Sequence, residues 1–182
     1  VDISVDSSTD SLQRRHYRRD TVEAPLNEVL AAGMLLLAGW NGKGPFVDPM
    51  CGSGTLPIEA ALIATDTPAQ IKRESFGFFK WPDFDQKLWK NIKSAADAKA
   101  HPFEFEILAS DKDSRARNST SLNLMSAGIE SAVRVAKSMF ENLEPPSPPG
   151  LLVMNPPYDE RLKIEDTIAF YKGIGDVLKK RW

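Results

Sequence analysis

The sequence contains very few of the residues on which cross-linked or metal-stabilised domains depend. Its 182 residues include one cysteine and two histidines. One cysteine excludes an internal disulfide framework, and so small a set of soft ligands gives no basis for a structural zinc site, so we expect no metal. A single thiol fits a reducing compartment, which predicts a cytoplasmic protein.

Long apolar runs and an excess of positive charge are also missing. The longest apolar run, Met34 to Ala38, is far shorter than the roughly 18 residues that would span a bilayer, and the first residues carry no signal-peptide pattern. We therefore expect no membrane partner. With 23 Lys and Arg against 25 Asp and Glu, the net charge is -2, which argues weakly against tight binding of nucleic-acid phosphates by this domain alone.

The composition is that of a globular protein, with 42% hydrophobic and 26% charged residues. Strands are predicted at 45–48, 105–110, 133–137 and 151–154, and helices at 25–38, 56–64, 86–99, 113–127 and 164–180. Because strand-like and helical segments alternate, we predict an α/β fold with a parallel sheet and helices on both of its faces.

The N-terminal residues 1–20 are predicted to form a hairpin, with short strands at 2–7 and 12–17. Gln13 to Arg19 reads QRRHYRR, which is typical either of an exposed basic strand edge or of a surface that contacts phosphates. The next helix is predicted to have Pro25 in its first turn and to bury one face. That face comprises Leu26, Val29, Leu30, Gly33, Met34 and Leu37.

Residues 65–85 are predicted to form an irregular segment that is rich in aromatic side chains. The aromatic residues are Phe76, Phe78, Phe79, Trp81 and Phe84. They fit the internal packing of a long surface loop, and they also fit a platform on which nucleic-acid bases stack.

A glycine-rich turn follows the first predicted strand of the sheet, in the stretch VDPMCGSGT from Val47 to Thr55. Gly52 and Gly54 let the backbone turn tightly and pass close to a ligand, and the helix that follows offers free N–H groups. The turn is not a Walker A loop, because no GK[ST] follows, and it lacks the third glycine of GxGxxG. Alone, this pattern is equally typical of a structural joint between a strand and a helix.

Two acids follow the next predicted strand. Asp111 stands where that strand ends, and a carboxylate at this position suits the paired hydroxyls of a ribose. An N-cap of the following helix is the alternative role for such an acid, and Asp113 is the better candidate for it.

The strand at 151–154 runs directly into Asn155-Pro156-Pro157-Tyr158. Two prolines make a stiff exit from the strand and leave carbonyl oxygens free to accept hydrogen bonds. An exocyclic amine on a purine is a poor nucleophile because its lone pair is delocalised into the ring. The Asn155 side-chain oxygen and the Pro156 carbonyl can accept its two hydrogens, which directs the lone pair toward an electrophilic methyl group, while Tyr158 offers a face for base stacking.

All three motifs directly follow predicted strands. In an open parallel sheet the carboxyl ends of the strands share one edge, and ligands bind in the crevice beyond it. We therefore expect the glycine-rich turn, Asp111 and the Asn155–Tyr158 segment to lie at the same edge.

In this order and spacing, the three motifs resemble the class I S-adenosylmethionine-dependent methyltransferases that methylate amino groups. The resemblance is closer still to the RNA methyltransferases that often carry an upstream THUMP domain, a family that includes the bacterial 23S rRNA guanine-N2 methyltransferase. The stretches that carry it are DSSTDSLQRRHYR, APLNEVLA, DPMCGSGTLPIEAA, NPPYDERL and FYKGIGDVLKKRW.

The resemblance implies a Rossmann-like sheet, S-adenosylmethionine as cofactor, and ribosomal RNA as the partner that is methylated. It implies that Asp111 binds the ribose of the cofactor and that Asn155, Pro156, Pro157 and Tyr158 hold the target base and are catalytic. The full set of implied cofactor-binding residues is Pro25, Asp48, Met50, Cys51, Gly52, Gly54, Thr55, Asp111 and Asn155.

The sequence also departs from the family pattern. His16 and Asp159 stand where the family tends to have glycine. The end of the predicted strand at 133–137 has Ser138 where the family often places an acid against the adenine, so the recognition of adenine is left open. Residues 21–182 are interpreted as a methyltransferase domain that is truncated at its C-terminus, since the fold normally has further strands, and no THUMP domain is present in this chain.

Two other functions remain open at this point. A DNA adenine-N6 methyltransferase uses the same chemistry at Asn155–Tyr158, although the FxG loop often found near its cofactor is missing here. A non-catalytic module that binds the cofactor or RNA is the other alternative. A cytosine-C5 methylase is disfavoured because it needs a nucleophilic cysteine near the base, whereas Cys51 lies in the glycine-rich turn as a small residue expected to be buried.

Overall fold

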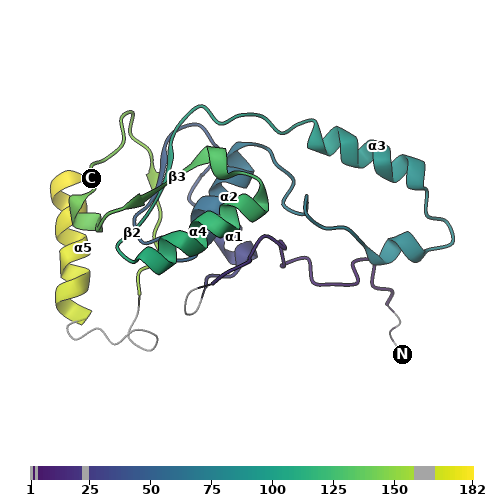
Figure 1. The fold of residues 1–182 in the computed structure, drawn as a ribbon, viewed down its shortest axis with the longest axis horizontal. Helices are drawn as coiled ribbons and strands as arrows, with labels where there is room; N and C mark the ends of the chain where they lie inside the picture. Colours follow the sequence, from purple (N-terminus) through teal and green to yellow (C-terminus); the bar gives the residue numbers. More distant parts are fainter. Residues whose placement is uncertain (1, 3, 22–24, 158–166) are drawn as a thin grey trace.

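The computed structural model of the chain describes residues 2, 4–21, 25–157 and 167–182. Four parallel strands form one sheet in the order β3-β2-β1-β4 (Figure 1). The strands are β1 Phe46–Asp48, β2 Ile107–Asp111, β3 Val133–Lys137 and β4 Leu151–Leu152. The predicted α/β fold is thus confirmed, although β4 is shorter than the expected strand at 151–154.

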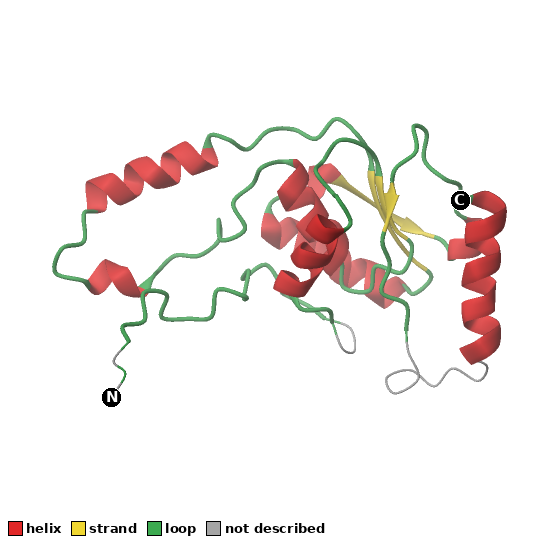
Figure 2. Ribbon diagram, turned by 180° about the vertical axis from the view of Figure 1, so that it is seen from behind, coloured by secondary structure: helices red, strands yellow, loops and turns green. Residues whose placement is uncertain are grey.

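Helices cover both faces of the sheet, as predicted (Figures 1 and 2). Three lie together on one face and the last helix lies on the other. Their bounds are α1 Glu28–Leu37, α2 Thr55–Ala64, α4 Ser114–Ala127 and, on the opposite face, α5 Thr167–Arg181. Nine of the ten residues of α2 are buried, so the helix that follows the glycine-rich turn is the central helix of the domain.

The two faces of the sheet are built by alternate residues of its strands. Phe46 and Ile107 pack into the larger hydrophobic core with α1, α2 and α4, whereas Val47 and Leu108 pack with Phe140 into a smaller core beneath α5. Because successive side chains of a strand point to opposite faces, a strand covered on both faces reads as a continuous apolar run. This is why the strands were recognisable in the sequence.

Helix α1 does not bury the face that its sequence predicted. Its buried residues are Ala31 and Leu35, while Leu30 is 55% exposed and Leu37 is 92% exposed. The helix begins at Glu28, where the Asn27 side chain accepts hydrogen bonds from two N–H groups of the first turn, so Pro25 precedes the helix and does not lie in its first turn. The small side chain of Ala31 allows close packing against α2, which the apolar pattern alone did not reveal.

The predicted N-terminal hairpin is also wrong, because the described residues of 1–20 form no strand. Residues 4–20 instead run as an irregular segment, here called the strap. Side chains distant in sequence take its backbone acceptors: Arg73 donates to the Ser8 and Asp10 carbonyls, and Gln70 donates to the Leu12 carbonyl. When side chains donate hydrogen bonds to the backbone carbonyls of a segment, those carbonyls do not require a neighbouring strand as donor.

Residues 66–102 form a lobe that projects from the helical side of the domain (Figures 1 and 2). It contains the 3-10 helix η1 Gly77–Lys80 and the helix α3 Gln86–Asp97, which has no buried residue. The backbone N–H of His101 donates to the Thr65 carbonyl over 2.9 Å and ties the two ends of the lobe together. Two further 3-10 helices, η2 Glu130–Ala132 and η3 Phe140–Asn142, flank β3.

Membrane-spanning helices and metal-ligand clusters are both absent from the described ranges. None of the helices at those positions combines the length and apolar character needed to cross a membrane. The same residues contain no group of three or more His, Cys, Asp and Glu side chains arranged to hold a metal ion.

Candidate active site

The three motifs come together at the carboxyl edge of the sheet, as their positions after strands predicted. They follow β1, β2 and β4, and β1 lies between the other two in the sheet. The glycine-rich turn bends over the end of β2, because the Cys51 N–H donates to the Ser110 carbonyl over 2.9 Å and the Gly52 N–H donates to Asp111 Oδ2 over 3.0 Å. Asn155 to Pro157 continue from β4, and Tyr158 lies outside the described residues.

The glycine-rich turn depends on its two left-handed glycines. Gly52 has φ 55° and Gly54 has φ 86°, a region that favours glycine. A Cβ on Gly54 would lie 2.8 Å from Thr120 Cγ2, and the Thr120 hydroxyl donates to the Gly52 carbonyl over 2.9 Å. The turn is therefore packed against α4 from within the protein, and Gly54 is required by that packing whatever the turn binds.

The two acids at the end of β2 have separate roles. The Asp113 side chain accepts from the Arg115 N–H over 2.9 Å and caps α4, which confirms the predicted N-cap. Asp111 is partly exposed, and its two oxygens accept from the Gly52 and Asp113 N–H groups over 3.0 and 2.9 Å. Each carboxylate oxygen has a second lone pair, so this fixed carboxylate can still accept from a pair of hydroxyls.

Asp48 is the most deeply buried acid of the edge, with 1% of its surface exposed. Its Oδ1 accepts from the Met50 N–H over 3.1 Å. Burial raises the pKa of this carboxyl to about 8, and the charge of Asp111 raises it further. Asp48 therefore carries a proton at neutral pH in the ligand-free protein, and a cation placed beside it would favour the charged carboxylate.

Cys51 is a buried thiol, 6% exposed, with its Sγ 3.5 Å from Thr120 Oγ1. Burial is the main cause that raises the pKa of this thiol far above its usual range. Because the thiolate is the nucleophile, a thiol held in its protonated form is not one. The expectation of a small buried residue is confirmed.

The other predicted cofactor residues lie around the turn in different environments. Thr55 is buried and begins α2, and Met50 packs at the border of the smaller core. Pro25 is exposed and precedes α1, but the carbonyl of its neighbour Leu26 accepts from Arg18, whose guanidinium also reaches the turn. Beyond β3, the Ser138 carbonyl accepts from the Ser110 hydroxyl over 3.1 Å.

On the β4 side, Asn155, Pro156 and Pro157 are partly buried. The Tyr171 hydroxyl, from α5, donates to the Pro157 carbonyl over 3.2 Å. This contact joins the segment after β4 to the helix on the far face of the sheet. Sequence reasoning missed Tyr171, although it belongs to the FYKGIGD stretch that carries part of the family resemblance.

Arg18 is the second residue that sequence reasoning missed. Its guanidinium donates to Ser53 Oγ over 3.0 Å and to Thr55 Oγ1 over 3.1 Å, and it pairs with Glu28 at 3.1 Å. Arg15, from the same basic stretch, forms an ion pair with Glu59, an acid that is 2% exposed. These two arginines are neither a strand edge nor a phosphate contact, because each pairs with an acid and Arg18 also fixes the turn.

Asn123 completes the polar network behind the turn. This fully buried side chain donates to the Ser53 carbonyl over 2.9 Å and accepts from the Arg19 N–H over 2.7 Å. A buried amide with partners on both sides holds the strap against the turn. The turn is thus fixed by α4, by the strap and by β2.

The chain matches the family model described as the RMKL-like methyltransferase domain over residues 15–182. A ribosomal RNA large subunit methyltransferase K/L from Methylococcus capsulatus is 39% identical over 188 residues, which cover 99% of this chain and 26% of that protein.

Two solved structures share the fold. One is that of SMU.472, described as a methyltransferase complexed with SAH, with a TM-score of 0.82, 32% identity, and coverage of 95% of this chain and 45% of that one. The other, a Listeria monocytogenes protein named as an N6-adenine-specific DNA methylase, has a TM-score of 0.82, 32% identity, and coverage of 96% and 46%. The chain thus spans less than half the length of each of these three proteins.

Proposed function

The chain belongs to the RMKL-like methyltransferase domain family, and from this membership and the geometry of its site we propose that the full-length protein methylates an exocyclic amino group of a base in RNA, guanine N2 of 23S rRNA, with S-adenosylmethionine as methyl donor. The observation that carries the proposal is the meeting of the glycine-rich turn, Asp111 and Asn155–Pro157 at one sheet edge. Residues 1–20 would precede the methyltransferase domain at 21–182, and an upstream THUMP domain would dock the RNA.

The half of the edge after β1 and β2 would hold the cofactor. SMU.472, which shares this fold, is described as complexed with SAH, the demethylated form of that cofactor. Asp111 would accept from the ribose hydroxyls, and the turn from Asp48 to Thr55, with Pro25 beside it, would surround the methionine part. The buried Asp48 carboxyl suits this position, because a cationic ligand would stabilise its charged form. When bound, the cofactor supplies a methyl group on a positively charged sulfur.

The half of the edge after β4 would hold the target amine. Asn155 Oδ1 and the Pro156 carbonyl would accept its two hydrogens, leaving the nitrogen lone pair directed at the methyl carbon. These contacts strengthen as the nitrogen becomes pyramidal, so they favour the transition state over the bound substrate. Tyr158 would stack on the base. No nucleophilic cysteine is needed, in keeping with the buried, protonated thiol of Cys51.

The choice of RNA rests on the relatives. The Methylococcus capsulatus protein named for large-subunit rRNA methylation aligns with 99% of this chain. A second candidate is methylation of adenine N6 in DNA, which the name of the Listeria monocytogenes structure favours and which the same Asn-Pro-Pro-Tyr chemistry would serve. The two functions differ in the nucleic acid and in the base, so product analysis separates them.

The experiment is mass spectrometry of nucleosides from cells with and without the gene. The proposal predicts that N2-methylguanosine in 23S rRNA falls when the gene is removed and returns with the wild-type gene. N6-methyladenine in genomic DNA is measured in the same cells, and a loss confined to DNA would replace the RNA proposal with the second candidate. An Asn155→Ala gene serves as the control for catalysis, because it should restore the protein and leave the nucleoside absent.

A further inference from the structure

The projecting lobe, residues 66–102, carries an aromatic cluster that is not buried by the domain. Phe76, Phe78, Phe79, Phe84 and Trp89 are all partly exposed. Their rings contact one another closely, with centroids 5.2 Å apart for Phe76–Phe78 and 5.4 Å for Phe79–Trp89. Packing of a surface loop accounts for these mutual contacts, but it leaves ring surface facing solvent, where single aromatic faces are available to a flat ligand.

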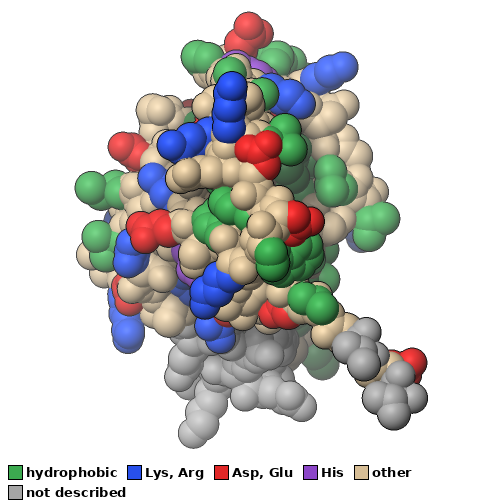
Figure 3. All heavy atoms as spheres, turned by 90° about the vertical axis from the view of Figure 1, so that its right-hand side faces the viewer, with side chains coloured by type: hydrophobic (Ala, Val, Ile, Leu, Met, Phe, Trp, Pro, Cys, Tyr) green, Lys and Arg blue, Asp and Glu red, His purple; other side chains and the backbone are tan. Residues whose placement is uncertain are grey.

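The same lobe is positively charged in a chain that is negative as a whole. Residues 66–102 contain seven Lys and Arg against five Asp and Glu, whereas the chain has a net charge of -2. Lys72, Lys80, Lys87 and Lys90 are exposed, and no salt bridge joins them to another described residue. Figure 3 looks at the side of the molecule on which α3 projects, where Lys and Arg side chains lie among hydrophobic and acidic ones.

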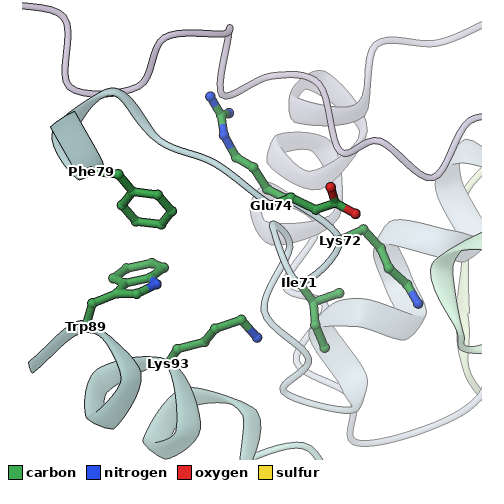
Figure 4. Close-up of a pocket in the computed structure, with 7 residues that line it drawn as sticks. Ile71, Lys72, Glu74, Phe79, Trp89 and Lys93 are labelled. Carbon is green, nitrogen blue, oxygen red and sulfur yellow. The ribbon is translucent and has the colours of Figure 1, made fainter. Parts of the chain in front are cut away.

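A cavity of about 470 Å³ lies where the cluster meets these cations (Figure 4). Phe79 and Trp89 line one side of it, with Lys93 beside Trp89, and Ile71 and Lys72 line the side nearer to the domain. The lining also includes the carboxylate of Glu74, so the two ammonium groups and Arg73 outnumber one acid there. An open cavity of this size beside an aromatic pair has room for a nucleobase, with the cations near its phosphates. Lys93 also pairs with Asp97 at 2.7 Å, so Lys72 is the cation left for a phosphate.

Arg73 also lines this cavity and connects it to the strap. Its guanidinium lies over the Phe76 ring, 4.7 Å from the centroid, and donates to strap carbonyls. Its Nη1 is buried and has no hydrogen-bond partner in the described structure. A second, polar cavity of about 440 Å³ adjoins the first and is lined by Arg19, His16, Lys72 and Arg73. Asp10 and Glu74 also line it, so the cations outnumber the acids there without standing alone.

We propose that the projecting lobe is a second RNA-binding surface, which stacks bases of a single-stranded segment on Phe79 and Trp89 and holds the adjoining phosphates with Lys87 and Lys90 of α3 and with Lys72. The combination of stacking faces and unpaired cations is the one by which single-stranded nucleic acid is held without sequence preference. The proposal rests on RNA being the substrate of the proposed function.

This surface is separate from the catalytic edge. Helix α2 starts at the glycine-rich turn and ends at Ala64, just before the lobe, so the lobe leaves the domain at the opposite edge of the sheet. The strap joins the two places, because it contacts Arg73 at one end and the turn through Arg18 at the other. A bound RNA would therefore contact the protein at two places. The target base would lie at the catalytic edge, and a single-stranded segment would bind to the lobe and add affinity.

The test measures the binding of a single-stranded oligouridine to the full-length protein by fluorescence anisotropy. We compare the Lys87→Glu/Lys90→Glu double variant with Lys179→Glu/Lys180→Glu, which makes the same change of charge at exposed positions of α5. The proposal predicts that the α3 variant binds oligouridine about tenfold or more weakly, while the α5 variant binds as wild type. In the α3 variant, the slope of the logarithm of the binding constant against the logarithm of the salt concentration should become shallower by about 1.4, which is about 0.7 for each lost phosphate contact.

Stacking is tested by Trp89→Leu, which keeps an apolar side chain, with circular dichroism to verify the fold. An abasic oligoribonucleotide of equal length has the same charge and no bases. The wild type should prefer oligouridine over the abasic strand, about fivefold or more, and Trp89→Leu should lose that preference. Loss of affinity for both strands alike would contradict stacking and leave a purely electrostatic surface.

The alternative occupant is another protein surface, which the exposed Leu88 and Ile92 of α3 would also suit. Amide hydrogen exchange distinguishes the two occupants, because a protein surface that covers α3 would protect its amides in the RNA-free full-length protein. Such protection, together with unchanged RNA affinity of Lys87→Glu/Lys90→Glu, overturns the proposal. Failure of the proposed function looks different, because the wild type would then methylate no RNA whatever the lobe binds. If the wild-type protein methylates RNA but no lobe variant changes the RNA affinity, the lobe is not an RNA-binding surface. The proposed function would still stand in that case.

Discussion

The two halves of the carboxyl edge are built differently. After β1 and β2, the turn is held by buried polar groups, with Ser53 3% exposed, Thr55 4% exposed and Asn123 fully buried. After β4, Asn155 to Pro157 are partly buried and are joined to α5 by the Tyr171 hydroxyl. Under the proposed function, the first half would be preorganised for a ligand of fixed shape, whereas the second half would present its acceptors to a base that must enter and leave. The comparison predicts that the halves can be damaged separately.

The largest expected effect is on the preorganised half. Gly52→Val places a branched side chain at φ 55°, a conformation that Val disfavours, in the residue whose N–H contacts Asp111. We expect loss of detectable S-adenosylmethionine binding by calorimetry on the full-length protein, with Gly33→Ala in α1, where a Cβ meets nothing within 4 Å, as the matched control. Unchanged affinity in Gly52→Val would show that the cofactor does not bind at this turn.

On the other half, Asn155→Ala should lower kcat by roughly 10²–10³, the cost of removing one oriented polar group from a transition state. Cofactor affinity should change little, because Asn155 follows β4 and the proposed ribose contact follows β2. Steady-state methylation of rRNA and calorimetry of the cofactor measure the two quantities. Wild-type turnover by this variant would refute the positioning of the amine.

Asp111→Ala should weaken cofactor binding by roughly 1–3 kcal/mol, since it removes charged hydrogen bonds to the ribose. It also removes the acceptor of the Gly52 N–H, so some loss of stability should accompany it. Asp113→Ala is the matched control, because it removes the α4 cap, costs about 1 kcal/mol of stability and leaves the affinity intact. Equal losses of affinity in both variants would show that Asp111 acts only through folding.

Asp48 predicts a smaller effect that depends on pH. Because burial raises the pKa of its carboxyl from 3.8 to about 8, the native state keeps a proton that the unfolded state has lost. This contribution to stability therefore falls as the pH rises from about 4 to about 8. Asp48→Asn should remove that fall, giving a Tm above the wild type at pH 8 by on the order of a few degrees. A parallel pH dependence in both proteins would contradict the buried, protonated acid.

The smallest expected effect is that of Tyr158→Phe, which keeps the ring and should leave methylation nearly unchanged. Tyr158→Ala should instead weaken RNA binding at the site by about 1–3 kcal/mol through lost stacking. The measurement is the KM for RNA and the kcat of each variant, compared with the wild-type values. Equal impairment of both would mean that the hydroxyl makes a hydrogen bond and that stacking is not the role of this residue.

The sequence alone was sufficient to predict the parts of the fold whose signals are local. Strand β3 was predicted at its observed bounds, and Asp113 caps the start of α4 as expected. The meeting of the motifs at one edge followed from parallel topology, which places every strand's carboxyl end on the same side. Local periodicity and capping chemistry carry this information, so no knowledge of distant contacts was required.

What could not be predicted depends on contacts between distant residues. The strap has no strands because Gln70 and Arg73 take its carbonyls, and neither side chain is near it in sequence. Arg18 and Arg15 face inward because Glu28 and Glu59 are there to pair with them. His16, which stands where the family tends to have glycine, has φ 62°, so the departure at this position keeps the left-handed backbone that glycine would provide.

The most direct test of the divided edge measures two quantities on the same preparations of wild type, Asn155→Ala and Asp111→Ala full-length protein. These are the cofactor Kd by calorimetry and the single-turnover rate of rRNA methylation at saturating cofactor. We predict a crossover: Asn155→Ala keeps its Kd and loses roughly 10²–10³ in rate, whereas Asp111→Ala loses affinity and keeps most of its rate. Proportional loss of both quantities in both variants would contradict it.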